Sequence, residues 1–546
     1  MIPRPAVAAF FLGSSTLLFE VSLTRVFSFA QGYHFSFLAV SLALIGSAAG
    51  GAAAALARSR LAPGHWLLGV HWWCLLAAAT LPVSFAVANA APLDIYALAW
   101  SWRQAGWLAV YASSLAVPFL FTGMGTALAL EGARGSAGAV YAASLLGSSG
   151  GALLAVAALA VIGPVGAVGL ASGLAAAGAA SATTGLKAMG AAVGLVAVSV
   201  VAPWGEVLEV RSSQYRPLWQ ALHAAGAKHL VSRWTAEGRV DVVEGPNLRM
   251  AAGLALGCEY RVPDQTMVYL DGNDPRALTR SARNGERGFT ECLPARAALE
   301  LRPVRDILVV EPSSDVSLWL ALAHGDRVTA LVSRAALADA MSHEQWGSEA
   351  LRSGVSLLND NARAFLVGQN GWDAIYYPLR GGYRPVAWGA ASLGEDYHLT
   401  VEAFAQALSA LEPGGLLVTE SWLQQPPSES LRVWATLIAA LRQVGTTDPA
   451  QHLLAARSMQ TMLMAASKEP WLDAEVRSFR SQASRLGLDL VWAPGVRPDE
   501  TNRINVLPQS IYYEAFATAL RDREWLRAYP LSVMPATDGR PFPHDY

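Results

Sequence analysis

Carboxylates and hydroxyls gather in a short segment, residues 311–315, which reads Glu-Pro-Ser-Ser-Asp. The segment ends an apolar run at 307–310 that is typical of a buried strand. Ligands of open α/β sheets bind beyond the carboxyl ends of the strands. Glu311, Ser313, Ser314 and Asp315 are therefore candidate binding residues, and the two carboxylates could hold a cation or ligand hydroxyls. The alternative is that Ser313, Ser314 or Asp315 caps the helix that follows.

A second polar cluster, Glu395-Asp-Tyr-His398, precedes a helical pattern at 398–411. Glu395, Asp396, Tyr397 and His398 could contain a catalytic dyad for acid–base chemistry. The alternative is an acidic helix start, which the helix dipole favours. Glu395 and Asp396 are candidate substrate-side residues under the first interpretation.

Two ionisable residues, Glu20 and Arg25, lie inside an apolar stretch. A charge in lipid costs at least about 2.5 kcal/mol, so each must face a helix bundle, a partner or the other. Five residues turn about 140° around a helix, which makes pairing between them poor. Both a structural and a functional role in the membrane remain open for this pair.

The elements that must position these residues fall into two halves. Residues 1–204 carry only ten charged side chains, about 5% of the segment, whereas residues 205–546 are about 21% charged. Apolar stretches long enough to span a bilayer predict helices at 6–30, 34–57, 66–89, 105–130, 138–162, 164–182 and 187–203. The last two are rich in glycine and alanine, so we predict six or seven spans. Small residues at helix-packing spacing, such as Gly46 and Gly50 or Gly147 and Gly151, indicate a compact bundle.

The loop charges predict the orientation of these spans. If the helices alternate, Arg4, Arg58, Arg60, Arg134 and Lys187 share one side, and the positive-inside rule places that side in the cytoplasm. Six spans would keep residues 205–546 in the cytoplasm and seven would export them. We favour seven, because 40 residues at 164–203 exceed one crossing of about 30 Å. The chain is then an integral protein of the bilayer, the inner or plasma membrane in a bacterium.

The polar half shows two patterns. Short strand-like runs at 239–244 and 266–272 predict a small β-rich subdomain at 205–300. From 301 to 546, apolar strands alternate with helices, which predicts a Rossmann-like, doubly wound parallel sheet. The predicted architecture is thus a helical membrane bundle (1–204) followed by an α/β fold. Three cysteines without paired spacing exclude a disulfide-rich scaffold, and a net charge of −2 does not favour a nucleic-acid partner.

Several segments together resemble the spermidine synthases, and more closely their membrane-fused relatives, a family of polyamine aminopropyltransferase-like proteins. The resemblance rests on segments in both halves of the chain: Leu18-Phe-Glu-Val-Ser-Leu-Thr-Arg25, Val140-Tyr-Ala-Ala-Ser-Leu-Leu-Gly147, Tyr215-Arg-Pro-Leu-Trp219, Gly238-Arg-Val-Asp-Val-Val-Glu244, Leu270-Asp-Gly272, Leu411-Glu-Pro-Gly-Gly415, Asp499-Glu-Thr-Asn-Arg503 and Pro535-Ala-Thr-Asp-Gly-Arg-Pro-Phe542. Asp271 falls in the segment that is similar to the family's substrate-side hairpin.

The resemblance implies a transferase that binds decarboxylated S-adenosylmethionine and passes an aminopropyl group to an amine. It also implies a glycine-rich loop after the first Rossmann strand, an acid at the end of the second, and an acidic loop after the fourth. This chain departs at all three places. Residues 311–316 contain no glycine, Ser333 stands near the acid's position, and the 373–380 segment places Asp373 before its strand and Arg380 after it. Arg380 would repel a polyamine.

These departures favour a non-catalytic protein, whose α/β domain docks or assembles other membrane subunits and needs no cofactor or metal. One alternative is a transferase with a rebuilt site that uses S-adenosylmethionine or its decarboxylated form. A second is a polyamine-linked transporter that uses Glu20 and Arg25 in its membrane path. The sequence contains no zinc-ligand spacing, P-loop or hydrolase elbow.

Overall fold

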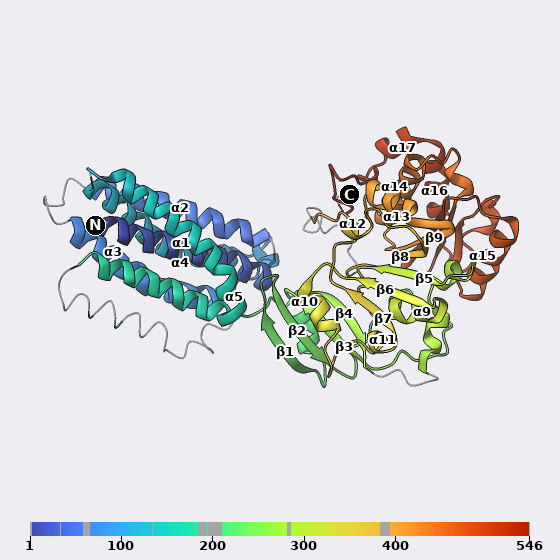
Figure 1. Cartoon of the computed structure of the whole chain (residues 1–546), viewed down its shortest axis with the longest axis horizontal. Coiled ribbons are helices and arrows are strands. Elements are labelled where there is room, and N and C mark those ends of the chain that lie inside the picture. The colour runs from blue at the N-terminus through green and yellow to red at the C-terminus, as the bar shows by residue number, and fades with distance from the viewer. Residues whose placement is uncertain are drawn as a thin grey trace. The chain divides into compact units, whose positions relative to one another are not determined.

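The computed structural model describes residues 3–32, 34–57, 66–133, 135–183, 190, 194, 210–280, 286–382 and 394–544. The chain divides into two compact units (Figure 1). The first comprises Met1–Trp219 with Ser232–Val240, and the second comprises Gln220–Val231 with Asp241–Tyr546. Each unit is described below by itself.

The first unit is built on five helices, each long and apolar enough to cross a membrane (Figure 1). They are α1 (Arg4–Ala30), α2 (His34–Ala57), α3 (Trp66–Ala90), α4 (Trp102–Gly132) and α5 (Ala137–Ser181). The first four lie where four spans are predicted. A short 3-10 helix, η2 (Tyr96–Ala99), stands between α3 and α4.

Helix α5 is broken at Gly163, whose φ of 69° leaves the helical region just before Pro164. Ser14 Oγ donates to Gly147 O at 2.9 Å in the first half, and Ser15 Oγ donates to Ala171 O at 2.7 Å in the second. Farther along the second half, Gly178 lies against Ala8. After the break, the α1 residues that contact α5 shift from Ser15 back toward the amino end of α1. The two halves of α5 therefore run in opposite directions. The predicted helices 138–162 and 164–182 meet at this break, whereas 187–203 lies outside the described residues.

Small residues let the helices of the bundle touch backbone to backbone. A Cβ atom on Gly147 would lie 2.0 Å from Phe10 O, and one on Gly50 would lie 2.1 Å from Leu120 O. Real side chains cannot approach that closely, so the packing of α5 on α1 and of α2 on α4 requires glycine at these positions. This is the small-residue packing that membrane helices use in place of a hydrophobic driving force.

The first sheet has four strands in the order β1-β2-β3-β4. Its members are β1 (Lys228–Trp234), β2 (Arg239–Glu244), β3 (Gln265–Leu270) and β4 (Asn273–Thr279). Asp271 and Gly272 form the two-residue turn between β3 and β4, with φ values of 50° and 70°. Asp-Gly is a preferred pair for such a hairpin turn, because both central residues need positive φ.

The second sheet has eight strands in the order β12-β10-β11-β9-β8-β5-β6-β7. Its members are β5 (Asp306–Val310), β6 (Arg327–Leu331), β7 (Val355–Leu358), β8 (Trp372–Tyr377), β9 (Leu411–Trp422), β10 (Leu453–Arg457), β11 (Thr461–Ser467) and β12 (Asp489–Trp492). Strands β7, β6, β5, β8 and β9 are parallel, as predicted. The prediction of a wholly parallel sheet was wrong, since β9–β11, β11–β10 and β10–β12 pair antiparallel. The short connection between β10 and β11 permits only a hairpin.

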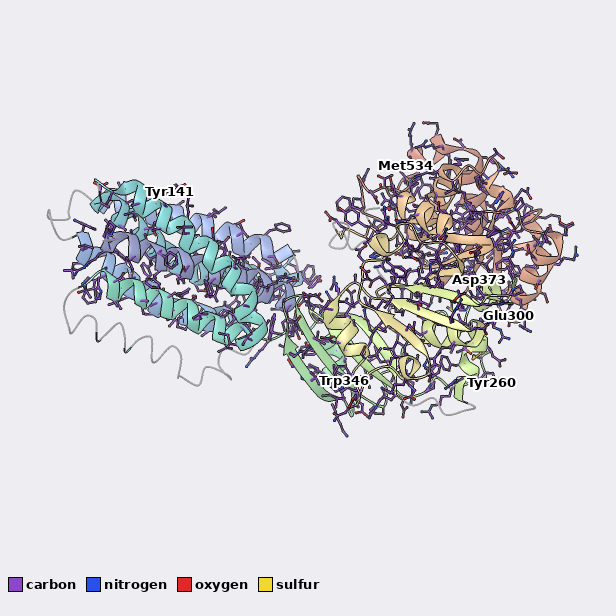
Figure 2. The ribbon with its side chains drawn as sticks, in the orientation of Figure 1. Tyr141, Tyr260, Glu300, Trp346, Asp373 and Met534 are labelled. Atoms are coloured by element: carbon purple, nitrogen blue, oxygen red, sulfur yellow. A yellow bond between two sulfur atoms is a disulfide. The ribbon has the colours of Figure 1, made fainter. Side chains whose placement is uncertain are left out.

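Helices cover both faces of this sheet, which gives a Rossmann-like α/β arrangement (Figure 1). Leu308 and Val310 face a core shared with α13 (Val401–Ala410), α14 (Glu429–Gln443) and α16 (Ile511–Arg521). Ile307, which points to the opposite face because side chains alternate along a strand, reaches Gly325 at the end of α9 (Val316–His324). Figure 2 shows how densely side chains fill the space on both sides.

Candidate functional site

Two adjoining cavities lie at the carboxyl ends of the parallel strands β5, β8 and β9, where the ligands of such sheets bind. The larger has a volume of about 290 Å³ and polar walls. The smaller, of about 50 Å³, is lined mainly by apolar side chains. Ser313 and Gly381 line both, so the two cavities meet at the loops that follow β5 and β8.

Glu311 ends β5 with a left-handed backbone, φ 51°, which is uncommon for a residue with a side chain. Its carboxylate accepts a hydrogen bond of 2.6 Å from the backbone N–H of Ser333, just beyond β6. Burial works against ionisation, but Arg380, the Ser333 N–H and Arg276 outweigh it and hold the pKa of Glu311 below its ordinary value. The carboxylate thus bridges the ends of β5 and β6 as an anion.

The loop after β5 is closed by hydrogen bonds to the protein itself. Arg276 Nη1 donates to Pro312 O at 2.6 Å, and Ser313 Oγ donates to Leu379 O. Ser314 Oγ donates to Ala277 O at 3.2 Å. The polar groups of residues 311–314 therefore hold neighbouring strands together, and no glycine gives a ligand close access to the backbone.

Asp315, which the sequence analysis selects as a candidate ligand-binding residue, makes its hydrogen bonds within the protein. It is fully buried and does not line either cavity. Its carboxylate accepts from Thr279 N at 2.7 Å and from Thr279 Oγ1 and Ser348 Oγ at 2.8 Å each. Burial raises the pKa of Asp315 to about 6, although these hydrogen bonds oppose the rise. The residue precedes α9 without a side-chain cap, so it ties β4 to that helix start instead.

Asp396 and His398 come together in the larger cavity, as the dyad hypothesis requires. His398 Nδ1 lies 3.1 Å from Asp396 Oδ1, and Arg380 pairs with the other oxygen at 2.9 Å. Burial alone would raise the pKa of Asp396, but Arg380 and His398 hold it well below its ordinary value. The backbone N–H of Asp396 donates to Pro541 O at 2.7 Å, so the carboxyl-terminal segment fixes the cluster.

The other two predicted substrate-side residues differ in placement. Glu395 lies on the wall of the larger cavity and is exposed. Asp271 occupies the β3–β4 turn and lines neither cavity. Asp274 and Arg276, three and five residues farther along the hairpin, reach the larger cavity in its place. Asp373 is the second residue of β8 and does not precede the strand as predicted, but it lies at the opposite, amino end of the strands, where it accepts hydrogen bonds from Arg305 N and Asp306 N (Figure 2).

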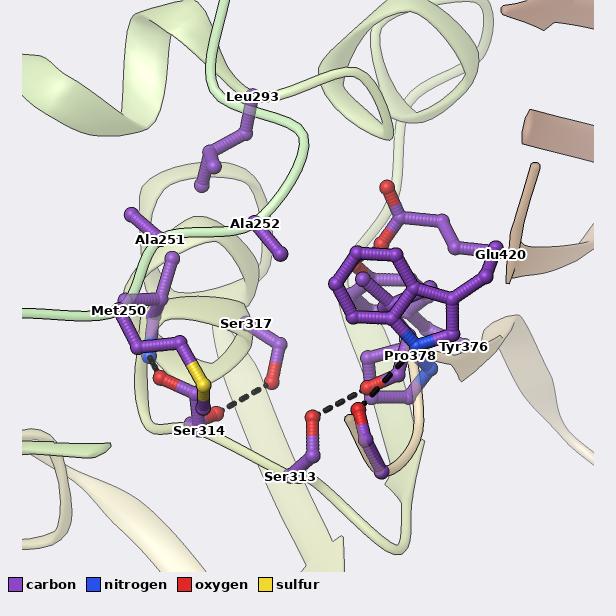
Figure 3. A pocket seen from close by; sticks show the side chains of 14 residues that line it. Met250, Ala251, Ala252, Leu293, Ser313, Ser314, Ser317, Tyr376, Pro378 and Glu420 are labelled. Carbon is purple, nitrogen blue, oxygen red and sulfur yellow. Dashed lines mark hydrogen bonds between the residues drawn. The ribbon is translucent and has the colours of Figure 1, made fainter. Parts of the chain in front are cut away.

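The smaller cavity holds a carboxyl group that sequence analysis did not select. Glu420 Oε2 accepts a hydrogen bond of 2.5 Å from the Tyr376 hydroxyl, and both residues line the cavity (Figure 3). Burial raises the pKa of Glu420 to about 7, although its hydrogen bonds with Tyr376 and the Leu379 N–H oppose the rise. A carboxyl group that titrates near neutral pH can act as a general acid or base. The position of Glu420 near the carboxyl end of β9 was the sequence signal that could have identified it as a site residue.

Glu20 and Arg25 stand apart from these cavities, on α1. Glu20 is half-buried and Arg25 is exposed. Within the described part of the chain, the structure gives no ion pair between them, which fits their angular separation on the helix.

A disulfide joins Cys258 to Cys292 in the second unit, which the sequence analysis missed. The two cysteines are 34 residues apart, and no spacing rule predicts such a pair. The bond tethers the irregular segment after β2, whose residues Met250, Ala251 and Ala252 form one wall of the smaller cavity (Figure 3).

No protein-family model matches the chain, and no curated protein sequence matches it. Among solved structures, it is similar to a probable spermidine synthase from Corynebacterium glutamicum ATCC 13032, at 15% identity over 47% of this chain and 86% of that one, with a TM-score of 0.29. A precorrin 8w decarboxylase from Methanobacterium thermoautotrophicum matches at 16% identity over 32% and 88%, and an rRNA methylase from Streptococcus thermophilus at 14% over 32% and 95%, each with a TM-score of 0.22. Scores this low carry no argument about activity.

Proposed function

We propose that this chain is an integral membrane protein whose α/β unit does not transfer aminopropyl groups. In this proposal the unit is a non-catalytic module that docks or assembles other membrane subunits. The observation that carries the proposal is the closed loop after β5. Glu311, Pro312 and Ser313 each bond to a neighbouring loop or strand, where a nucleoside cofactor needs open backbone.

The charges of the larger cavity support the same proposal. Arg380 occupies the loop after β8, where the resemblance implies acids that hold a cationic amine, and Asp396 neutralises it within the protein. A polyamine would have to enter beside the guanidiniums of Arg276, Arg334 and Arg380, which all line the cavity. Like charges at such short range are unfavourable even with partial screening.

The placement of chain ends in the first unit supports export of the α/β unit from the cytoplasm. A cluster of buried residues at one end of the bundle includes Ala6, Ala54, Ala133 and Ala182. Arg4 begins α1 at this end. The other basic residues that the sequence predicts on the same side, Arg58, Arg60, Arg134 and Lys187, lie outside the described residues. By the positive-inside rule this end faces the cytoplasm.

The described chain resumes at the opposite end. Ser213 N donates to Ala30 O at 2.9 Å, and the Tyr215 hydroxyl donates to Asp94 Oδ2 at 3.0 Å. The described chain is therefore at the end of the bundle that holds Arg4 at residue 183 and at the far end by residue 213, which supports the proposal of a seventh crossing. The Cys258–Cys292 disulfide supports the same side, because disulfides persist in oxidising compartments outside the cytoplasm.

Two experiments test these proposals separately. Protease added to intact cells or to right-side-out vesicles should digest residues 220–546 and leave the bundle protected. Digestion only after the membrane is broken would overturn the external location. Gentle purification of the full chain should yield a fixed set of membrane subunits in constant proportion, and a chain that purifies alone under several mild detergents would count against the docking role.

A second candidate function is a transferase with a rebuilt site, favoured by the Glu420–Tyr376 pair. A carboxyl group with a pKa of about 7 beside a small cavity is suited to take a proton from an attacking amine. Under this alternative, purified protein transfers an aminopropyl or methyl group, and Glu420→Gln lowers the rate by about 100-fold or more. No transfer by the wild-type chain leaves the non-catalytic proposal in place.

A further inference from the structure

The walls of the larger cavity carry charges of both signs. Three guanidiniums line it: Arg276 from β4, Arg334 from the loop after β6 and Arg380 from the loop after β8. Carboxylates from Asp274, Glu311 and Glu395 share the same lining. A ligand that is purely cationic or purely anionic would meet like charges on part of this surface. A ligand that carries both charges would match it.

His398 adds a specific hydrogen-bonding requirement. Asp396 is ionised through its pairing with Arg380, so the His398 Nδ1 that faces it carries the proton. In the neutral imidazole with this tautomer, the other ring nitrogen, Nε2, is an acceptor. It is buried and has no hydrogen-bond partner among the residues the structure describes. Because buried polar atoms are almost always paired, this nitrogen calls for an N–H or O–H donor from the cavity side.

We propose that the larger cavity binds a small zwitterion, a free amino acid or a compound with the same ammonium and carboxylate groups. The ammonium group donates to His398 Nε2 and is attracted by the carboxylates of the wall. The carboxylate group accepts from Arg334, which is exposed at the cavity rim. This inference rests on the proposed function, because it requires that no nucleoside cofactor occupies the site.

The dimensions of the cavity agree with a ligand of this class. A volume of about 290 Å³ is roughly ten times the volume that one water molecule takes in the liquid. It therefore holds on the order of ten non-hydrogen atoms, the size of a common amino acid. The residues involved come from the ends of β5, β6 and β8 and from the segment before α13, so the fold brings them together at one edge.

Calorimetric titration of the full chain in detergent tests the proposal. The probes are L-serine, L-glutamate and L-lysine, with ethanolamine and 3-hydroxypropionate as the singly charged counterparts of serine. We expect at least one amino acid to bind below about 1 mM, and the singly charged counterparts to bind at least about tenfold more weakly than serine where serine binds. No binding of any of the three at about 10 mM, or equal binding of a zwitterion and its singly charged counterpart, would overturn the proposal.

Matched variants locate the binding. His398→Gln and Arg334→Gln should each lower affinity by about tenfold or more, whereas His343→Gln, at an exposed histidine stacked on Trp346, should not change it. Arg334 is exposed, so its variant keeps the test decisive if His398→Gln fails to fold. Unchanged affinity in Arg334→Gln and in any folded His398→Gln protein would overturn the assignment.

Titration of S-adenosylmethionine into the same samples distinguishes failure of the zwitterion inference from failure of the proposed function. If the amino acids and S-adenosylmethionine both fail to bind, only the zwitterion inference falls. If S-adenosylmethionine binds tightly in the larger cavity, the proposed function falls, and the zwitterion inference that rests on it falls too.

Discussion

The bundle and the α/β unit bury their polar groups in different ways. In the bundle, buried hydroxyls donate to backbone carbonyls, as Ser22 does to Leu18 and Ser14 does to Gly147. In the α/β unit, charged side chains are buried in pairs, such as Arg457 with Asp489 at 3.0 Å. An ion pair needs several fixed donors around it, which loops and strand ends supply and lipid-facing helices do not.

The two regions therefore differ in the interactions that hold them together. The bundle owes its packing to close backbone contact at glycines. The α/β unit owes its site to charges that converge at strand ends and to one covalent tether. Changes in shape should therefore damage the bundle most, and changes in charge, pH or redox state should act on the α/β unit.

The largest effect should come from Gly147→Leu. Its Cβ alone would lie 2.0 Å from Phe10 O, so α5 must move away from α1. We expect a loss of more than about 3 kcal/mol or failure to fold, because overpacking against a backbone cannot be relieved by a rotamer change. Gly150→Leu is the matched control, since nothing lies within 4 Å of its Cβ position. Folded yield and thermal midpoint in detergent measure the effect, and equal behaviour of the two variants would contradict the packing account.

Reduction of the Cys258–Cys292 disulfide should destabilise the α/β unit by about 2–3 kcal/mol, because the unfolded chain gains the entropy of an opened loop. Chemical unfolding followed with and without a phosphine reductant measures the loss, and Cys258→Ser with Cys292→Ser should reproduce it. Cys74 is the one free cysteine in the described chain and lies buried in the bundle. A reductant effect that persists in the double variant would show that the disulfide is not its source.

Acidification from pH 8 to pH 5 should stabilise the α/β unit by on the order of 2 kcal/mol. The folded pKa values of Asp315, about 6, and Glu420, about 7, lie above their unfolded values. A raised folded pKa means that the native state binds the proton more tightly. Its contribution is therefore complete below about pH 4 and is lost as the pH rises through 6 and 7.

Below about pH 4 the sign should reverse, since Asp396 and Glu311 have lowered pKa values and lose their native partners on protonation. Denaturant midpoints measured from pH 8 to below pH 4 test both the gain in stability on mild acidification and its reversal below about pH 4. Glu420→Gln should flatten the slope between pH 5 and pH 8. An unchanged slope in that variant would show that Glu420 does not titrate there.

The smallest effect should come from Glu20→Gln in the bundle. Glu20 is half-buried, and no ion pair joins it to Arg25 among the described residues. We expect a change within about 0.5 kcal/mol in thermal stability, as for an isolated surface position. A loss of more than about 2 kcal/mol would reveal a buried ionic partner. If polyamine uptake into proteoliposomes occurs and Glu20→Gln abolishes it, the transporter alternative gains its first support.

Periodic patterns predicted most of the fold. The apolar stretches marked the helices of the bundle, and Gly163 with Pro164 marked the break in α5. Alternating strands and helices from Asp306 onward marked the parallel part of the second sheet. The antiparallel strands β10 to β12 were missed, because short buried strands look the same in sequence whichever direction they pair.

Individual site residues were harder to predict. The position of Asp315 after a strand indicated ligand contact, but its side chain turns inward to Thr279. Glu420 ends its own strand and joins the site only because β9 lies beside β8. Cys258 and Cys292 meet through the fold and not through any local spacing. Each of these depends on long-range packing, which one-dimensional patterns do not contain.

We propose that the α/β scaffold does not bind the cofactor that the sequence resemblance implies. Calorimetric titration of the folded, full-length protein with decarboxylated S-adenosylmethionine and with S-adenosylmethionine tests it most directly. The closed loop at Glu311, Pro312 and Ser313 predicts no binding heat for either compound up to millimolar concentration. Binding of either at micromolar concentration would contradict the account and identify a rebuilt transferase site.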